Sequence, residues 1–262
     1  MKVKTANLDT RKLAYVDEGK GETIVLIHGF CGSHEYWEDV IPELAKEYRV
    51  IAPDLNGHGK SSLSDSVCAV EDLSEDIKDL IGHLGLDQVT MLGHSLGGYI
   101  TLAFADHQSN RLKGYGLIHS TAFPDDEAAR KKRDSTIEEI KEKGIKSVID
   151  QMVPNLFAPD TSLTEKIQKA KRIGYETASE GAIAAAIAMK NRPNRNDVLQ
   201  NSKIPVLLVA GESDQVVPPE KTFSVAKENI IQATLKGAGH MGMYEARDAL
   251  VEEINAFMKK IK

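Results

Sequence analysis

The chain has 262 residues, of which 41% are hydrophobic and 27% are charged. This length predicts one large domain or two small ones, and the composition is that of an ordinary globular protein in water. The formal net charge of −6 argues against a nucleic-acid partner, because such binding depends on clustered Lys and Arg that neutralise phosphates.

Short apolar runs alternate with helical patterns along most of the chain. The runs are rich in branched residues and end at Gly, Pro or polar residues, which is typical of strands buried on both faces. They cover residues 23–28, 49–53, 88–92, 114–119 and 205–210, with an alternating pattern at 13–17 and a weaker run at 229–235. Apolar residues at helical spacing predict helices over 70–84, 97–107 and 248–259. This alternation predicts an α/β fold with a mostly parallel sheet and helices on both faces.

One long stretch lacks strand patterns. Between Ser120 and Ile204 the sequence shows helical segments near residues 126–143, 145–153, 162–173 and 176–189, punctuated by prolines. We interpret residues 121–203 as a helical cap inserted into a core domain made of residues 1–120 and 204–262. Such a cap would lie over the carboxyl ends of the strands, where open α/β sheets bind ligands.

Membrane, secreted and disulfide-rich classes are disfavoured. The longest strongly apolar run, residues 182–189, is far shorter than the roughly 20 residues that span a bilayer. The first residues lack the apolar segment of a secretory signal. Cys31 and Cys68 are too few for a disulfide framework or a multi-cysteine metal site, and we interpret both as ordinary semi-buried residues. We therefore expect a cytoplasmic monomer or homodimer without a membrane partner.

The most informative pentapeptide is Gly93-His94-Ser95-Leu96-Gly97. It reads G-x-S-x-G, directly after a predicted strand and directly before a predicted helix, which is the context of a nucleophile elbow. The two glycines let the strand and the helix approach each other, and the tight turn exposes the serine hydroxyl. The helix N-terminus behind the turn favours negative charge. We therefore predict that Ser95 is a nucleophile.

A serine hydroxyl needs a base to accept its proton, and the base needs an acid to orient it. His240 lies in a glycine-rich loop between the last predicted strand and the last predicted helix, as the chain order Ser, Asp, His requires. Asp214 follows the predicted strand at 205–210, and its rival Glu212 is expected to be a solvated loop carboxylate. We predict a triad of Ser95, His240 and Asp214, and we expect the remaining histidines to be structural or solvated.

Acyl transfer also needs N–H donors aimed at the developing oxyanion. The Leu96 N–H, one residue past the nucleophile, is the first candidate. The second is expected from the loop after the strand at 23–28, where we choose the Phe30 N–H. Gly29 and Gly32 allow this loop to turn inward. The competing interpretation is an ordinary glycine-rich turn.

Five motifs in the expected order resemble those of α/β-hydrolase fold proteins with a helical cap. They are H-G-F at residues 28–30, D-x-x-G-H-G-x-S at 54–61, G-H-S-x-G-G at 93–98, G-x-x-D at 211–214 and G-x-G-H at 237–240. The resemblance covers essentially the whole chain. It implies an eight-stranded, mostly parallel sheet, the triad named above, and an oxyanion hole made by Phe30 and Leu96. Ser95 stands where dehalogenases and epoxide hydrolases of this fold carry aspartate, which disfavours those two reactions.

The segment at 54–61 also mimics a phosphate-binding loop, because it ends in Gly59, Lys60 and Ser61. A phosphate loop would require a glycine where this chain has Asp54, and that carboxylate would repel phosphate. We interpret the segment as a structural turn.

The favoured function is hydrolysis of a small carboxylic ester or lactone through an acyl-enzyme on Ser95, with no metal and no organic cofactor. Two alternatives use the same triad. One is a lyase similar to those of the menaquinone pathway, which abstracts a proton and predicts cap arginines facing the pocket. The other is a cofactor-free haloperoxidase or perhydrolase. A ligand-sensing receptor on this fold is the non-enzyme alternative.

The substrate pocket is expected between the cap and the sheet. Its candidate lining residues are Phe30, Trp37, Tyr99, Phe123, Met152, Phe157 and Met189, among which Trp37, Phe123 and Phe157 are chosen for the substrate. The basic cluster at residues 130–133 would attract an anionic acyl chain, although a solvated helix face is the plainer interpretation.

Overall fold

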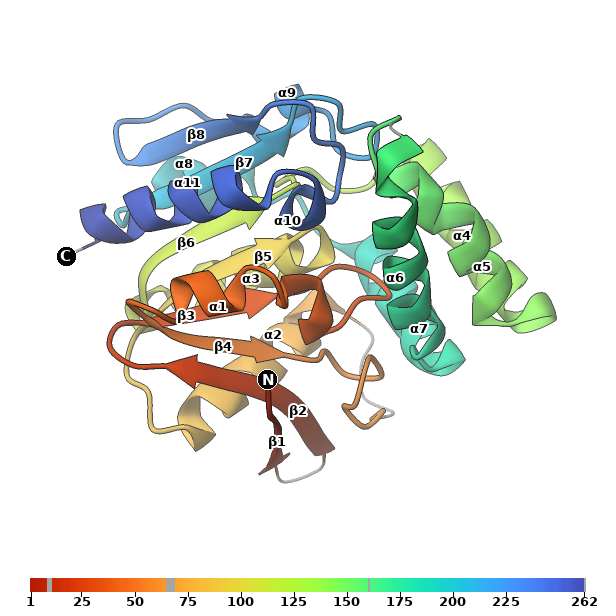
Figure 1. Ribbon diagram of the computed structural model, residues 1–262, viewed down its shortest axis with the longest axis horizontal. Helices are drawn as coiled ribbons and strands as arrows, with labels where there is room; N and C mark the ends of the chain where they lie inside the picture. The colour runs from red at the N-terminus through yellow and green to blue at the C-terminus, as the bar shows by residue number, and fades with distance from the viewer. Residues whose placement is uncertain (9–10, 65–68, 160, 262) are drawn as a thin grey trace.

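The computed structural model describes residues 1–8, 11–64, 69–159 and 161–261. Within these ranges, eight strands form one sheet in the order β1-β2-β4-β3-β5-β6-β7-β8 (Figure 1). Their bounds are β1 Val3–Leu8, β2 Arg11–Gly19, β3 Thr23–Ile27, β4 Arg49–Pro53, β5 Val89–His94, β6 Leu112–Ile118, β7 Val206–Gly211 and β8 Ile230–Leu235. Strand β2 runs antiparallel to both of its neighbours, and the other pairs are parallel. The predicted α/β class and mostly parallel sheet are confirmed.

Helices cover both faces of this sheet, as Figure 1 shows. On one face lie α1 (Ile41–Leu44) and α11 (Arg247–Lys260), and on the other lie α2 (Val70–His83) and α3 (Leu96–His107). Because side chains alternate along a strand, Ile24 of β3 packs in the cluster with α1 and α11, while Val25 packs with α2 and α3. All five residues of β3 are buried, which explains why this strand appears in the sequence as a continuous apolar run.

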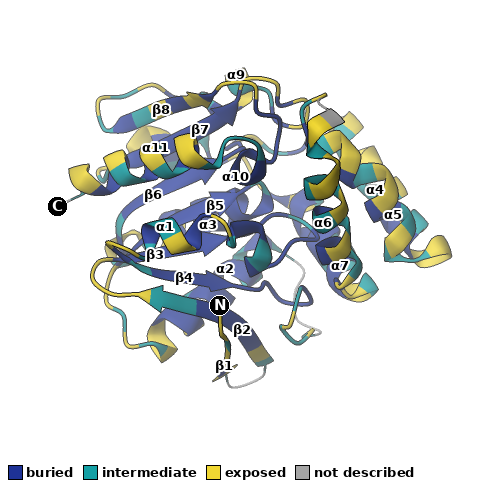
Figure 2. Cartoon of the chain, in the orientation of Figure 1, coloured by how far each residue is buried: buried dark blue, intermediate teal, exposed yellow. Residues whose placement is uncertain are grey.

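Four helices gather beyond the carboxyl ends of the parallel strands (Figure 1). They are α4 (Glu127–Lys143), α5 (Ile145–Met152), α6 (Thr164–Tyr175) and α7 (Ser179–Asn191), with the short turns η3 (Val153–Leu156) and η4 (Thr161–Leu163) between α5 and α6. Their outer surfaces are largely exposed, whereas the central strands β3, β5 and β7 are buried (Figure 2). The helix α8 (Asn196–Asn201) packs instead against α3, so the predicted segment 121–203 holds one helix on the sheet side. Its division into a separate domain stays an interpretation.

Short elements complete the connections. They are η1 (His34–Trp37), η2 (Ser109–Arg111), α9 (Pro219–Thr222) and α10 (Gly242–Glu245). Among the described residues, no helix combines the length and apolar character needed to cross a membrane. Cys31 is a free, buried cysteine, more enclosed than the predicted semi-buried position, and Cys68 lies outside the described residues.

The strand β1 was absent from the sequence-based expectation. It is an edge strand whose one partner among the described strands is β2, and Ala6 is the fully enclosed residue of its six. A strand held mainly by backbone hydrogen bonds at a sheet edge carries little hydrophobic pattern, so it left no clear signal in the sequence.

Candidate active site

Ser95 occupies the sharp turn between β5 and α3. Its backbone angles, φ 52° and ψ −113°, are strained for a residue with a side chain. Two hydrogen bonds hold the main chain there, from Ser95 N to Ile118 O at 3.0 Å and from Ser120 Oγ to Ser95 O at 2.7 Å. The turn therefore has the geometry that the G-x-S-x-G motif predicts.

The flanking glycines are required by close backbone contacts. A Cβ atom at Gly93 would lie 2.0 Å from Gly97 O, and one at Gly97 would lie 2.4 Å from Ile27 O. These distances are far below van der Waals contact, so any side chain at either position would push α3 away from the sheet.

Asp214 and His240 come together at the carboxyl ends of β7 and β8. His240 Nδ1 lies 2.8 Å from Asp214 Oδ2, and both side chains are almost fully buried. The other oxygen, Oδ1, accepts hydrogen bonds from the Val216 and Val217 amides at 2.8 and 2.9 Å. Burial alone would raise the pKa of Asp214, but hydrogen bonds from two histidines outweigh burial and hold the pKa below its usual value. The carboxylate is therefore ionised and orients the imidazole.

The second of these histidines is His119, which was expected to have only a structural role. Its Nδ1 lies 3.2 Å from Asp214 Oδ2, so one carboxylate oxygen receives two imidazole N–H groups. An ionised carboxylate can only accept hydrogen bonds, which fixes the proton on His119 Nδ1. The ring is fully buried and burial lowers its pKa, so it stays neutral. The sequence signal for this contact is its position at the end of β6, the neighbour of β7.

The backbone on either side of His240 is fixed by three groups. His94, next to Ser95 in the sequence, places its Nε2 2.8 Å from His240 O. The His240 N–H donates to Leu156 O in η3 at 2.7 Å. Glu245 Oε2 accepts the Gly239 and Met241 amides at 3.0 and 2.9 Å. The buried His94 ring, whose pKa lies well below its usual value because of burial, thus has the structural role expected from the sequence.

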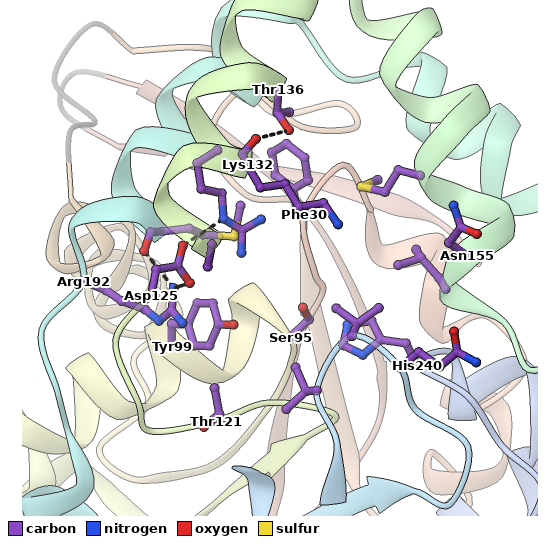
Figure 3. Close-up of a pocket in the computed structure, with 18 of the residues that line it drawn as sticks. Phe30, Ser95, Tyr99, Thr121, Asp125, Lys132, Thr136, Asn155, Arg192 and His240 are labelled. Atoms are coloured by element: carbon purple, nitrogen blue, oxygen red, sulfur yellow. Dashed lines mark hydrogen bonds and ion pairs between the residues drawn. The ribbon is translucent and has the colours of Figure 1, made fainter. Parts of the chain in front are cut away.

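Ser95 and His240 line the same cavity and both point into it (Figure 3). The His240 ring packs beside the ring of His94, with centroids 5.0 Å apart. The Ser95 hydroxyl forms no hydrogen bond with the ring, or with any other side chain in the part of the chain that the structure describes. In ligand-free enzymes such contacts are often long and shorten when substrate binds. The structure thus brings the three predicted triad residues together without closing the last contact.

Two backbone amides lie where the predicted oxyanion donors were expected. Leu96 is the first residue of α3, so its N–H has no partner within the helix. Phe30 lies in the loop after β3, and its amide donates no hydrogen bond within the described ranges. Glycines bring that loop close to the elbow, since a Cβ atom at Gly29 would lie 3.2 Å from the Ser95 Cβ. Their role as an oxyanion hole stays a prediction.

The cavity has a volume of about 640 Å³ and lies between the carboxyl ends of the strands and the cap. Its lining includes Phe30, Tyr99, Phe123, Met152 and Met189, all of which were candidate lining residues. The expectation was wrong for Trp37 and Phe157. Trp37 is fully buried beneath His94 in the core, and Phe157 stacks on Tyr244 with ring centroids 6.3 Å apart. Both rings fill space behind the cavity wall.

The D-x-x-G-H-G-K-S segment forms a structural turn. Asp54 is fully buried, and its carboxylate accepts hydrogen bonds from the His34 and Lys60 amides at 2.7 and 2.9 Å. Ser61 Oγ donates to Asp54 O at 2.7 Å. The carboxylate occupies the inside of the loop, where a phosphate would have to lie. The rival acid Glu212 is exposed and accepts the Gly237 amide.

One buried cluster has the atoms to hold a metal ion. Nitrogen and oxygen atoms of His119, Asp214 and His240 lie within 4.8 Å of one another. The hydrogen bonds described above already use the Nδ1 atom of each ring and the shared carboxylate oxygen. The Nδ1 atoms and the shared oxygen are therefore engaged with one another, while the buried His119 Nε2 has no hydrogen-bond partner among the described residues.

A family model described as alpha/beta hydrolase fold matches residues 22–246. The chain belongs to this family. A solved structure of a thermophilic esterase from Thermogutta terrifontis, with malate bound, is 30% identical and superposes with a TM-score of 0.92, covering 100% of this chain and 99% of that one. Among curated relatives, Lipase 1 of Psychrobacter immobilis is 28% identical over 94% of this chain and 80% of its own length.

Some relatives of this chain are longer proteins that are named for other reactions. The acetyltransferase component of the acetoin cleaving system of Pseudomonas putida is 29% identical over 92% of this chain, but the match spans only 65% of that longer protein. Taken together, the matches confirm the predicted family and fold, and the esterases and lipases among the relatives support the predicted hydrolase class.

Proposed function

We propose that this protein is a serine hydrolase that cleaves a small carboxylic ester or lactone through an acyl-enzyme on Ser95. The observation that carries the proposal is the shared cavity. A strained serine at a helix N-terminus and a histidine anchored 2.8 Å from a buried carboxylate open onto the same space. Esterases and lipases among the relatives support the reaction class.

In the first half-reaction, Ser95 Oγ attacks the substrate carbonyl carbon and His240 Nε2 accepts the hydroxyl proton. Asp214 stabilises the imidazolium that forms, because its ionised oxygen accepts a hydrogen bond from His240 Nδ1–H, which keeps its proton. The Leu96 and Phe30 amides donate to the negative oxygen of the tetrahedral intermediate. His240 then protonates the leaving alcohol, and the acyl group remains on Ser95.

In the second half-reaction, water attacks the acyl-enzyme while His240 accepts one of its protons. Collapse of the second tetrahedral intermediate releases the carboxylic acid and returns the proton to Ser95. All of the protein groups needed for these steps are side chains and amides of this chain, so the mechanism requires no metal or organic cofactor. The cavity volume of about 640 Å³ lies within the range of small-molecule sites and favours a small substrate.

A lyase that uses the same triad remains the second candidate. That alternative predicts cap arginines at the pocket, and Arg133 and Arg192 do line the cavity. Both, however, are ion-paired with Asp125, so their presence is compatible with either reaction. The two reactions differ in one respect that can be measured, because the lyase forms no acyl-enzyme.

Labelling with a fluorophosphonate probe tests the proposed nucleophile. The probe should modify the wild-type protein once, on the peptide that contains Ser95, and the modified protein should lose ester hydrolysis. A Ser135→Ala variant, which keeps the nucleophile and loses another hydroxyl of the cavity lining, should still be labelled. Labelling that persists in Ser95→Ala, or a wild-type protein that hydrolyses esters without being labelled, would contradict the proposal.

A further inference from the structure

Charged side chains are concentrated on the cap side of the cavity. Besides Ser95 and His240, the described residues of the lining include four cations and three acids. The cations are Lys132, Arg133, Arg192 and Lys221, and the acids are Asp125, Asp126 and Glu139. What this wall can bind depends on which of these groups already have partners.

The three acids are each occupied. Asp125 is nearly fully buried and accepts Arg192 Nη1 at 2.5 Å and Arg133 Nε at 3.0 Å. Glu139 Oε1 accepts the side chains of Ser147 and Gln151, each at 2.5 Å. The third acid, at position 126, caps the N-terminus of α4 by accepting an amide at 2.8 Å. None of these carboxylates is left without a hydrogen-bond donor.

The guanidinium of Arg192 is also engaged by neighbouring residues. Its side chain is only 5% exposed, its guanidinium donates to Phe123 O and Met189 O, and it lies 3.9 Å from the ring centroid of Tyr99. This arginine holds Asp125 and the segment around it in place, and it is not free to bind a ligand.

Lys132 and Arg133, on neighbouring positions of α4, differ from Arg192. Arg133 donates to Asp125 through its Nε atom, and its two terminal nitrogens form no hydrogen bond within the described residues. The Arg133 side chain is 26% exposed. The Lys132 ammonium forms no ion pair with any residue that the structure describes. Figure 3 shows the Lys132 side chain extending from α4 into the cavity. Unpaired donors of two cations thus face the space that Ser95 enters from the sheet side.

We propose that Lys132 and Arg133 form an anion subsite that binds a free carboxylate on the substrate, so that the preferred esters or lactones carry one negative charge. This inference rests on the proposed function, because it names the substrate class of the same site. A carboxylate accepts charge-assisted hydrogen bonds from both an ammonium and a guanidinium. The partly enclosed cavity screens such pairs less than bulk water does.

Paired substrates test this subsite. Monomethyl adipate and dimethyl adipate have the same chain and the same reacting ester, but only the first is anionic at neutral pH. We expect kcat/KM for methanol release, corrected for the two ester groups of the diester, to be about tenfold higher for the monoester, the effect of about 1.4 kcal/mol of binding. High salt should reduce this preference.

Three variants assign the preference to residues. Lys132→Gln and Arg133→Gln should each lower kcat/KM for the monoester about threefold while leaving the diester unchanged, and the double variant should remove the preference. Lys131→Gln is the matched control, because Lys131 is the next residue on α4, is paired with Glu127 on the surface and does not line the cavity. It should behave as the wild type.

Equal rates for the two esters in the wild type would overturn the subsite while leaving the proposed function intact. So would a preference that survives in the double variant, or a loss that affects both esters equally. If neither ester is hydrolysed, calorimetric titration of adipate into Ser95→Ala decides the question without turnover. Binding that weakens about threefold on Lys132→Gln supports the subsite, and an absence of binding, or binding that this change does not weaken, overturns it.

Discussion

His119 Nδ1 lies 3.2 Å from Asp214 Oδ2, the same carboxylate oxygen that accepts a hydrogen bond from His240 Nδ1 at 2.8 Å. The two rings lie 5.8 Å apart between centroids. The charge of Asp214 is therefore divided between a neutral structural histidine and the proposed base. This arrangement links a residue outside the triad to the carboxylate that orients His240.

We predict that His119→Phe shifts the acidic limb of the kcat/KM profile to higher pH, because His119 donates one of the hydrogen bonds that stabilise the Asp214 carboxylate. Removing one donor leaves the Asp214 carboxylate more strongly engaged with the His240 imidazolium. His119→Asn, which keeps an N–H donor near the same place, should restore the profile. An unchanged profile in His119→Phe, measured in a protein that is still folded, would show that His119 only fills space.

Glu245 should position His240 through the backbone. Its carboxylate accepts the Gly239 and Met241 amides and also the Ala158 amide of the cap at 2.7 Å. In Glu245→Gln an amide NH₂ group would face a backbone N–H. We predict that kcat falls about tenfold while KM changes little, because a small displacement of the base disturbs proton transfer more than binding. Glu252→Gln, an exposed glutamate on α11, is the control and should leave kcat unaltered.

The close approach of α3 to the sheet predicts opposite effects for two Gly→Ala changes. Gly97→Ala would put a Cβ atom 2.4 Å from Ile27 O, and we expect a loss of roughly 1–3 kcal/mol in the free energy of unfolding. Gly82→Ala in α2 has nothing within 4 Å, so it should gain roughly 0.5–1 kcal/mol from improved helix propensity. Urea denaturation of both variants checks the pair, and equal effects would be inconsistent with the contacts at the elbow.

The free energy of unfolding should begin to fall at a pH well above the range in which ordinary carboxylates titrate. Burial lowers the pKa of His28, His58, His94 and His119, so these rings stay neutral in the folded protein. The unfolded chain protonates them below a pH of about 6.5 and then binds more protons than the folded state, so stability falls as pH falls. Burial raises the pKa of Asp76 to about 6, so below that pH the folded protein binds one proton more than the unfolded chain at this residue. This effect stabilises the fold in acid, but it comes from one group whereas four histidines have the opposite effect.

The slope should reach about 1.4 kcal/mol per pH unit for each fully shifted histidine. Chemical denaturation between pH 7.5 and pH 5 should therefore show a steadily decreasing free energy of unfolding. A flat dependence over this range would mean that the four rings are protonated in the folded protein.

Much of the fold was predictable because its central strands are buried on both faces. Strand β4 was predicted at residues 49–53, the bounds that it has in the structure, and the serine elbow follows from local glycine and strand patterns. The edge strand β1 was missed because packing determines little of its sequence.

The contacts around the site were harder to predict, since they join elements far apart in the chain. His119 meets Asp214 across 95 positions because β6 and β7 are neighbours in the sheet. Trp37 and Phe157 were assigned to the pocket because they are large and aromatic, but the same property makes them core residues. Which way an aromatic side chain points depends on the packing of several elements and cannot be read from one segment.

Rapid-quench kinetics with p-nitrophenyl acetate test the central claim most directly. The activated leaving group makes acylation fast, so we predict a burst of about one p-nitrophenol per protein molecule and an acetyl group on the Ser95 peptide. Ser95→Ala should show neither, with kcat reduced by about 10⁴-fold or more. Steady hydrolysis without an acetylated Ser95, or full activity in Ser95→Ala, would contradict the acyl-enzyme mechanism.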